Sequence, residues 1–170
     1  MREALISIKP PYVKMFLGGE KSVEIRNRTV NLSPGSRLWI YSTLPKGCVE
    51  AVAEVGCVVV GTPSEIWRQY RDHLSVPKSK YLQYVNGSLA VSAIITKRVW
   101  RLPVEVNLSM LRSRVPGFHP PQFLKYMSDS DPVFLSIVQF LYDNTNEEYL
   151  QRIGLQTICT GSANARRGGK

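Results

Sequence analysis

Short apolar stretches alternate along the chain with polar stretches rich in proline and glycine. Residues 5–8 predict a first strand. A helix should follow, opening at the proline pair 10–11 and stopping at the glycine pair 18–19. In residues 21–28 apolar and charged side chains alternate, which is typical of a strand with one face toward a core. The first 28 residues therefore predict strand, helix and strand.

Three further stretches carry the β-branched and aromatic residues that strands favour. They are residues 37–43, residues 49–60 with a bend at Gly56, and residues 89–100 with a break at Pro103. The connections between consecutive strands are mostly too short for crossover helices. This favours a mixed, largely antiparallel sheet.

Helices interrupt and follow these strands. Residues 62–65 have the sequence of a capping box, and a second short helix is expected at residues 78–85, where the tyrosines are assigned to packing. After Asp131 apolar residues recur at helical spacing from 134 to 141, and a second capping box at 145–148 precedes a last short helix.

These elements predict an α+β fold in which the sheet curls into a barrel with flanking helices and a C-terminal helical extension. The expected divisions are a domain over 1–128, the helical extension over 129–158 and a disordered basic tail over 159–170. Periodicity alone leaves a closed barrel and an open α+β sheet as alternatives.

The charge of the chain points to an acidic partner. Its 170 residues hold 22 Lys and Arg against 13 Asp and Glu, for a net charge of +9 spread over the whole length. A basic globular domain attracts polyanions, although such a charge also serves solubility. RNA or a nucleotide is the expected partner and DNA the alternative; the oligomeric state stays open.

Other classes of function receive little support. No apolar run is long enough to span a membrane, and the N-terminus lacks the pattern of a signal peptide, so we expect a cytoplasmic protein without membrane contact. The three cysteines, at 48, 57 and 159, form no paired spacing, and the two histidines lack helical metal-ligand spacing. We expect no metal and no cofactor.

The charged strand is the main candidate site. Glu24, Arg26 and Arg28 should share one face, with Lys21 just before them. Arg26 can present a planar fork to a phosphate or a base edge, and Glu24 can accept from an exocyclic amine. The alternative is an ordinary surface ion pair.

Other residues are candidates for the same groove. Lys9 and Tyr12 stand where the first strand meets the first helix, and Tyr12 can either stack on a base or pack the helix. Tyr41 and Thr43 share a strand face that is either a stacking wall or core. Gln122 either closes the pocket or caps a helix.

Several of these segments resemble the ASCH domain family of the PUA-like superfamily. The resemblance is carried by residues 6–10, Tyr12 and the Gly-x-Lys-x-x-Glu-x-Arg core at 19–26, and it extends over about residues 3–127. Pro34-Gly35, the strand at 38–43 and Pro120-Pro121-Gln122 agree with it. The resemblance implies a small PUA-like β-barrel that binds RNA or a nucleoside.

The resemblance also implies possible chemistry. Some family members are similar to amidohydrolases that deacetylate a modified cytidine with a lysine, a threonine three residues later and a distant glutamate. Lys21 fits the lysine position, but Glu24 stands at the threonine position and residues 74–85 contain no glutamate. Ribonuclease activity is also known among relatives, and Lys21 beside Ser22 suits it.

Three hypotheses follow. The first is a binding module for RNA or a nucleotide-like ligand in a basic cleft, with a regulatory role as one variant. The second is a hydrolase, either an amidohydrolase or a ribonuclease, with Lys21 and Glu24 as the candidate catalytic residues. The third is an interaction protein that presents the apolar stripe of residues 134–141 to a partner.

Overall fold

The computed structural model describes residues 2–155 and contains a curled six-stranded sheet with six helices. The elements in chain order are β1 (Glu3–Ile8), α1 (Pro10–Leu17), β2 (Val23–Arg26), β3 (Arg37–Ser42), β4 (Cys48–Gly61), α2 (Pro63–Leu74), α3 (Lys78–Val85), β5 (Val91–Asn107), α4 (Leu108–Arg114), β6 (Leu124–Met127), α5 (Pro132–Asn144) and α6 (Glu147–Arg152). The predicted α+β class, with a sheet curled as in a PUA-like barrel, is confirmed. Residues 159–170, expected to be a disordered tail, lie outside the described residues.

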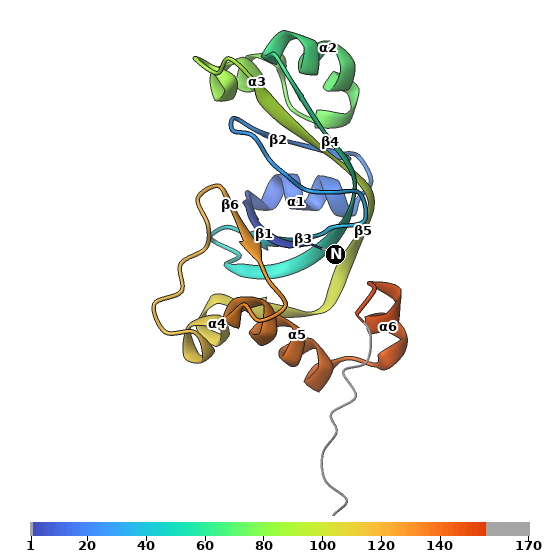
Figure 1. Cartoon of the computed structure of the whole chain (residues 1–170), viewed down its shortest axis with the longest axis vertical. Coiled ribbons are helices and arrows are strands. Elements are labelled where there is room, and N and C mark those ends of the chain that lie inside the picture. Colours follow the sequence, from blue (N-terminus) through green and yellow to red (C-terminus); the bar gives the residue numbers. More distant parts are fainter. Residues whose placement is uncertain (1, 156–170) are drawn as a thin grey trace, which may run out of the picture.

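The strands are arranged in the order β2-β5-β4-β3-β1-β6, so β2 and β6 form the two edges of the sheet. All neighbouring pairs are antiparallel except β1 and β3, which run parallel. The long strands β4 and β5 make a curved ribbon: α2 and α3 lie at one end, α4, α5 and α6 lie at the other, and α1 sits in its hollow (Figure 1).

Local sequence signals explain the elements on the N-terminal side. Prolines occupy the first turn of α1, where a missing N–H costs little, and the chain turns away at Gly18. The capping box of α2 forms as predicted, because Thr62 accepts from the Glu65 amide while the Glu65 carboxylate accepts from the Thr62 amide. The bend predicted at Gly56 coincides with a register shift between β4 and β5.

Two predictions on the C-terminal side were wrong. Pro103 does not break β5, because the pairing shifts between Val49 and Ala51 and leaves proline, which has no N–H, within an irregular stretch of the ladder. The cap of α6 is Asn146, whose side chain accepts from the Tyr149 amide. The helix α4 and the short strand β6 were not foreseen.

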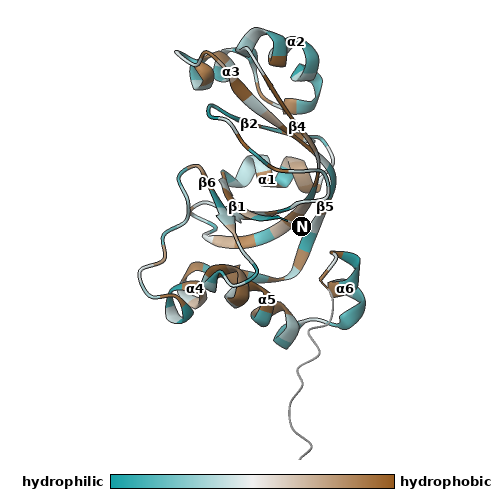
Figure 2. Cartoon of the chain, in the orientation of Figure 1, coloured by the Kyte–Doolittle hydropathy of each residue, from teal (hydrophilic) through white to brown (hydrophobic). Residues whose placement is uncertain are grey.

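The core has three parts that follow the curl of the sheet. The first lies between the sheet and α4, α5 and α6, the second between the sheet and α1, and the third between the sheet and α2 and α3. Hydrophobic residues run along the strands and α5, whereas α2 and α6 are largely hydrophilic (Figure 2). Phe134, Ile137 and Leu141 belong to the first part, so the stripe considered for a partner packs against the sheet instead.

The sheet does not close into a full barrel, because its edge strands β2 and β6 are not paired with each other. The candidate site lies at this opening. β6 pairs with β1 only over Glu3–Ile6, so the end of β1 extends beyond it. There the Arg26 guanidinium of β2 reaches across and donates to the Ser7 carbonyl of β1 at 2.9 Å. We call this gap between β2 and the end of β1 the seam. No helix among residues 2–155 has the length and apolar character needed to cross a membrane.

Candidate functional site

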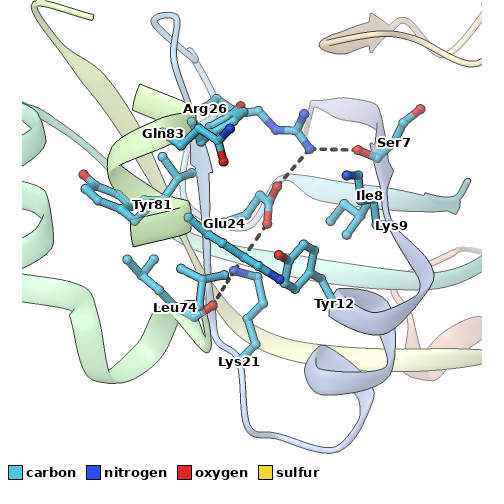
Figure 3. Close-up of a pocket in the computed structure, with 14 residues that line it drawn as sticks. Ser7, Ile8, Lys9, Tyr12, Lys21, Glu24, Arg26, Leu74, Tyr81 and Gln83 are labelled. Carbon is cyan, nitrogen blue, oxygen red and sulfur yellow. Dashed lines mark hydrogen bonds and ion pairs between the residues drawn. The ribbon is translucent and has the colours of Figure 1, made fainter. Parts of the chain in front are cut away.

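A pocket of about 500 Å³ opens at the seam, between α3 on one side and the β1–α1 junction on the other (Figure 3). Its size is within the range of small-molecule sites. The lining residues are Ser7, Ile8, Lys9, Tyr12, Lys21, Glu24, Ile25, Arg26, Leu74, Val76, Lys80, Tyr81, Gln83 and Tyr84. Five of the residues predicted for the site, Lys9, Tyr12, Lys21, Glu24 and Arg26, thus lie around one cavity.

Lys21 lies at the base of the pocket and is only 4% exposed. Its Nζ donates to the carbonyl oxygens of Val23 at 2.6 Å and Leu74 at 2.9 Å, and it lies 3.5 Å from Glu24 Oε2. Burial lowers the pKa of Lys21 below its ordinary value of 10.5, and the Glu24 carboxylate opposes that shift. These three acceptors match the three donors of an ammonium group, so Lys21 ties β2 to the end of α2 and orients Glu24.

Glu24 and Arg26 form the polar wall, and the alternation of β2 explains why they share it. Arg26 Nη2 donates to Glu24 Oε1 at 2.9 Å as well as to the Ser7 carbonyl. The Nε of Arg26 is buried and has no hydrogen-bond partner, and the same holds for the Ser7 hydroxyl. The Glu24–Arg26 ion pair that the sequence offered as an alternative does exist. It lines a pocket and is largely buried instead of lying on the surface, and it leaves the Nε donor of Arg26 unused.

The mouth of the pocket carries cations and aromatic rings. Lys9 and Lys80 are exposed and approach from opposite sides, one from the β1–α1 junction and the other from α3. The ring of Tyr12 lies 5.8 Å from Lys21 Nζ. Tyr84 is 45% exposed, and partial burial raises the pKa of its hydroxyl. Glu24 is the one carboxylate among the described residues that line this pocket.

Four residues predicted for the site lie outside the pocket. Arg28 is exposed and stacks over Phe123 at 5.6 Å, beyond the polar wall. Tyr41 is 2% exposed within the core beside α4 and α5, and Thr43 follows it just past the end of β3. Gln122 is exposed in a bend before β6 and caps no helix. The stacking wall proposed for Tyr41 is therefore part of the core.

The contribution of α3 was missed. Lys80, Gln83 and Tyr84 line the pocket although the sequence indicated only helix packing. Tyr81 does pack, with its ring 5.0 Å from that of Trp67 and its hydroxyl bonded to the Pro63 carbonyl. The polar and charged residues next to Tyr81 in the sequence were the signal that could have indicated a helix face turned toward a polar site.

The described residues show no cluster of side chains suited to a metal ion. Residues 2–155 hold no group of three or more His, Cys, Asp or Glu side chains placed to share a metal ion. The chemistry that the pocket offers is that of cations, one carboxylate and aromatic rings.

Comparison with known proteins gives a consistent result, although no protein-family model matches the chain. An ASCH domain-containing ribonuclease of Zymomonas mobilis is 29% identical over 127 residues, or 74% of this chain and 84% of the relative. The crystal structure of ASCH from Zymomonas mobilis has a TM-score of 0.73 at 27% identity, covering 81% of this chain and 94% of that one.

A more distant likeness concerns the fold alone. Human THYN1 protein, in complex with DNA that contains 5-methylcytosine, has a TM-score of 0.51 at 8% identity and covers 82% of this chain and 98% of that one. Motif, sheet topology and relatives agree: the chain is similar in sequence and in fold to the ASCH domain proteins of Zymomonas mobilis.

Proposed function

We propose that this protein binds RNA and accepts one nucleotide in the pocket at the seam. The observation that carries the proposal is the convergence of Lys21, Glu24 and Arg26 on one cavity of about 500 Å³. The names of the related ribonuclease and of the THYN1–DNA complex support nucleic acid as the class of ligand. The ribonuclease makes RNA the first choice.

The charges and unused donors of the pocket support an anionic, hydrogen-bonding ligand. Lys9, Arg26 and Lys80 add positive charge around a single carboxylate. The unpartnered Nε of Arg26 can donate to a base or a phosphate, and Glu24 keeps lone pairs free to accept from a base amine. Tyr12 and Tyr84 supply aromatic surface on which a base can stack.

Fluorescence anisotropy with a short labelled single-stranded RNA tests the proposal. Each phosphate that the protein neutralises should contribute about −0.7 to the slope of log affinity against log salt. Arg26→Met should lower the affinity at least about tenfold, because a charge-assisted hydrogen bond is lost. The exposed Lys80→Ala should lower it less without affecting folding.

Arg68→Met provides the matched control, because Arg68 is exposed on α2 and does not line this pocket. Its affinity should stay within about twofold of wild type. Circular dichroism checks that each variant is folded. If Arg26→Met and Lys80→Ala bind as Arg68→Met does, the proposal is wrong; DNA of the same sequence bound equally well removes the preference for RNA.

Cleavage of the bound RNA is a second candidate function. It is favoured by the name of the 29% identical relative and by a carboxylate held beside a buried lysine. Because the donors of Lys21 are already engaged, Glu24 is the better candidate for a base that takes the proton from a ribose 2′-hydroxyl. That oxygen would attack the adjacent phosphorus while the bond from phosphorus to the 5′-oxygen breaks. The 5′-oxygen would leave as a hydroxyl by taking the proton from Glu24, and a 2′,3′-cyclic phosphate would remain.

Gel analysis of RNA incubated with the protein tests this candidate. Glu24→Gln keeps one side-chain oxygen as an acceptor, so it should lose cleavage while its affinity for RNA falls far less, and RNA with one 2′-deoxy position should resist cleavage there. Cleavage at the deoxy position rules out this route. Deacetylation of a modified cytidine has less support, because α3 contributes Lys80, Tyr81, Gln83 and Tyr84 to the pocket, and no carboxylate.

A further inference from the structure

The pocket surrounds the free edge of β2. This strand pairs with β5 on one side only and ends the sheet on the other. Glu24 and Arg26 project from one face of the strand and Ile25 from the opposite face, yet all three line the pocket. A cavity that touches both faces of a strand lies against its edge, where the backbone polar groups are.

Hydrogen bonds on each side of β2 show which backbone groups point to that edge. The Ser22 carbonyl accepts from the Thr96 amide at 2.9 Å and therefore faces β5. Backbone groups of successive residues in an antiparallel ladder alternate in direction, so those of Val23 and Ile25 point away from β5. The Val23 carbonyl agrees, because it accepts from Lys21 Nζ.

The protein's own groups satisfy this edge at one end but not in the middle. The Val23 carbonyl is bonded to Lys21. By the same alternation the N–H and C=O of Ile25 face away from β5, and within residues 2–155 they have no protein partner outside the ladder. Ile25 is only 7% exposed, and an unpaired backbone group that is buried costs about as much as a lost hydrogen bond.

We propose that the N–H and C=O of Ile25 pair with the edge of the bound nucleobase, so that the base adds to β2 as a residue of a next strand would. The Watson–Crick edge of every base places a donor beside an acceptor, which matches this backbone pair. Glu24 and Arg26 flank the pair and can read the neighbouring base atoms. α3 and the β1–α1 junction enclose the edge, which favours one planar group over an added peptide strand.

This inference rests on the proposed function, and NMR of the wild-type chain tests both. The chain labelled with ¹⁵N is titrated with AMP, CMP, GMP and UMP. With the nucleotide that binds best, the Ile25 amide should shift downfield and its hydrogen exchange should slow, each by more than for Val23. Val23 serves as the reference because it lies on the same edge outside the pocket.

Replacing the amide of residue 25 by an ester, with the hydroxy-acid analogue of isoleucine, deletes this N–H and keeps the side chain. The affinity for the same nucleotide should fall about 3- to 10-fold, and the corresponding ester at residue 23 should have little effect. GMP methylated at N1, or UMP methylated at N3, should lose affinity to at least the same degree relative to its parent.

The outcomes separate the two proposals. If a nucleotide binds at the pocket but the Ile25 amide does not respond and the ester binds normally, edge pairing is refuted while the proposed function stands. If none of the four nucleotides nor RNA binds, both proposals fail. A peptide that binds in place of nucleotides and protects the Ile25 amide also overturns the inference.

Discussion

Replacing Lys21 with methionine removes a buried ammonium group while keeping a side chain of similar length. The carbonyls of Val23 and Leu74 lose their donor, and both residues are 0–1% exposed. Each unsatisfied buried acceptor costs about 1–3 kcal/mol, so the two losses together destabilise the fold by about 2–6 kcal/mol.

Removing the buried charge works in the opposite direction. Replacing a complete buried ion pair by apolar residues is often neutral or stabilising, because the cost of desolvation disappears. Here the Glu24 carboxylate remains after the substitution. It still accepts a hydrogen bond from Arg26 at 2.9 Å, so it costs less than an unpaired buried charge. We expect a net loss of about 2–3 kcal/mol in the free energy of unfolding and a fall of roughly 4–12 °C in Tm.

Urea denaturation and thermal melting measure this loss. Lys14→Met is the matched control, because Lys14 is exposed in the last turn of α1 and should change stability by no more than about 0.5 kcal/mol. If Lys21→Met is as stable as wild type, the hydrogen bonds to the two carbonyls do not outweigh the cost of desolvating the ammonium group. Lys21 then does not stabilise the contact between β2 and α2.

Further predictions concern pH and helix capping. The lowered pKa of Lys21 means that the unfolded chain binds more protons between the native value and 10.5; urea titrations should therefore show wild type gaining stability relative to Lys21→Met as pH rises through that interval. Burial raises the pKa of Tyr149 to about 12, and its hydroxyl donates to the Arg101 carbonyl at 2.5 Å. Its stabilisation relative to Tyr149→Phe should be complete below about pH 10 and decline above it; a difference that does not change with pH would contradict this. Asp131→Ala removes the cap of α5 and should cost about 1 kcal/mol by denaturation, whereas Lys97→Ala, which breaks a surface pair with Glu54, should cost less; equal costs would refute the capping role.

The strand and helix order up to β5 could be predicted because its signals are local. Alternation, proline pairs and capping boxes act within a few residues of one another. β6 has four residues and no clear alternation, and its existence depends on pairing with β1. Pro103 lies in β5 because a ladder irregularity accommodates it, which depends on β4 and not on the neighbouring sequence.

The candidate site could be predicted only as far as one strand determines it. Alternation along β2 was sufficient to place Glu24 and Arg26 together. The sequence could not indicate that β3 lies away from the pocket, so Tyr41 stayed open between wall and core. Lys80 and Tyr84 reach the pocket because α3 packs back over the seam, an arrangement that depends on tertiary contacts.

A single guanidinium, that of Arg26, joins β2 to the end of β1 where the backbone ladder is interrupted. Replacing that side chain removes no backbone pairing from the sheet, because β2 is paired only with β5. Laboratory evolution can therefore alter the pocket through Arg26 and α3 while the strand pairings that build the fold are kept.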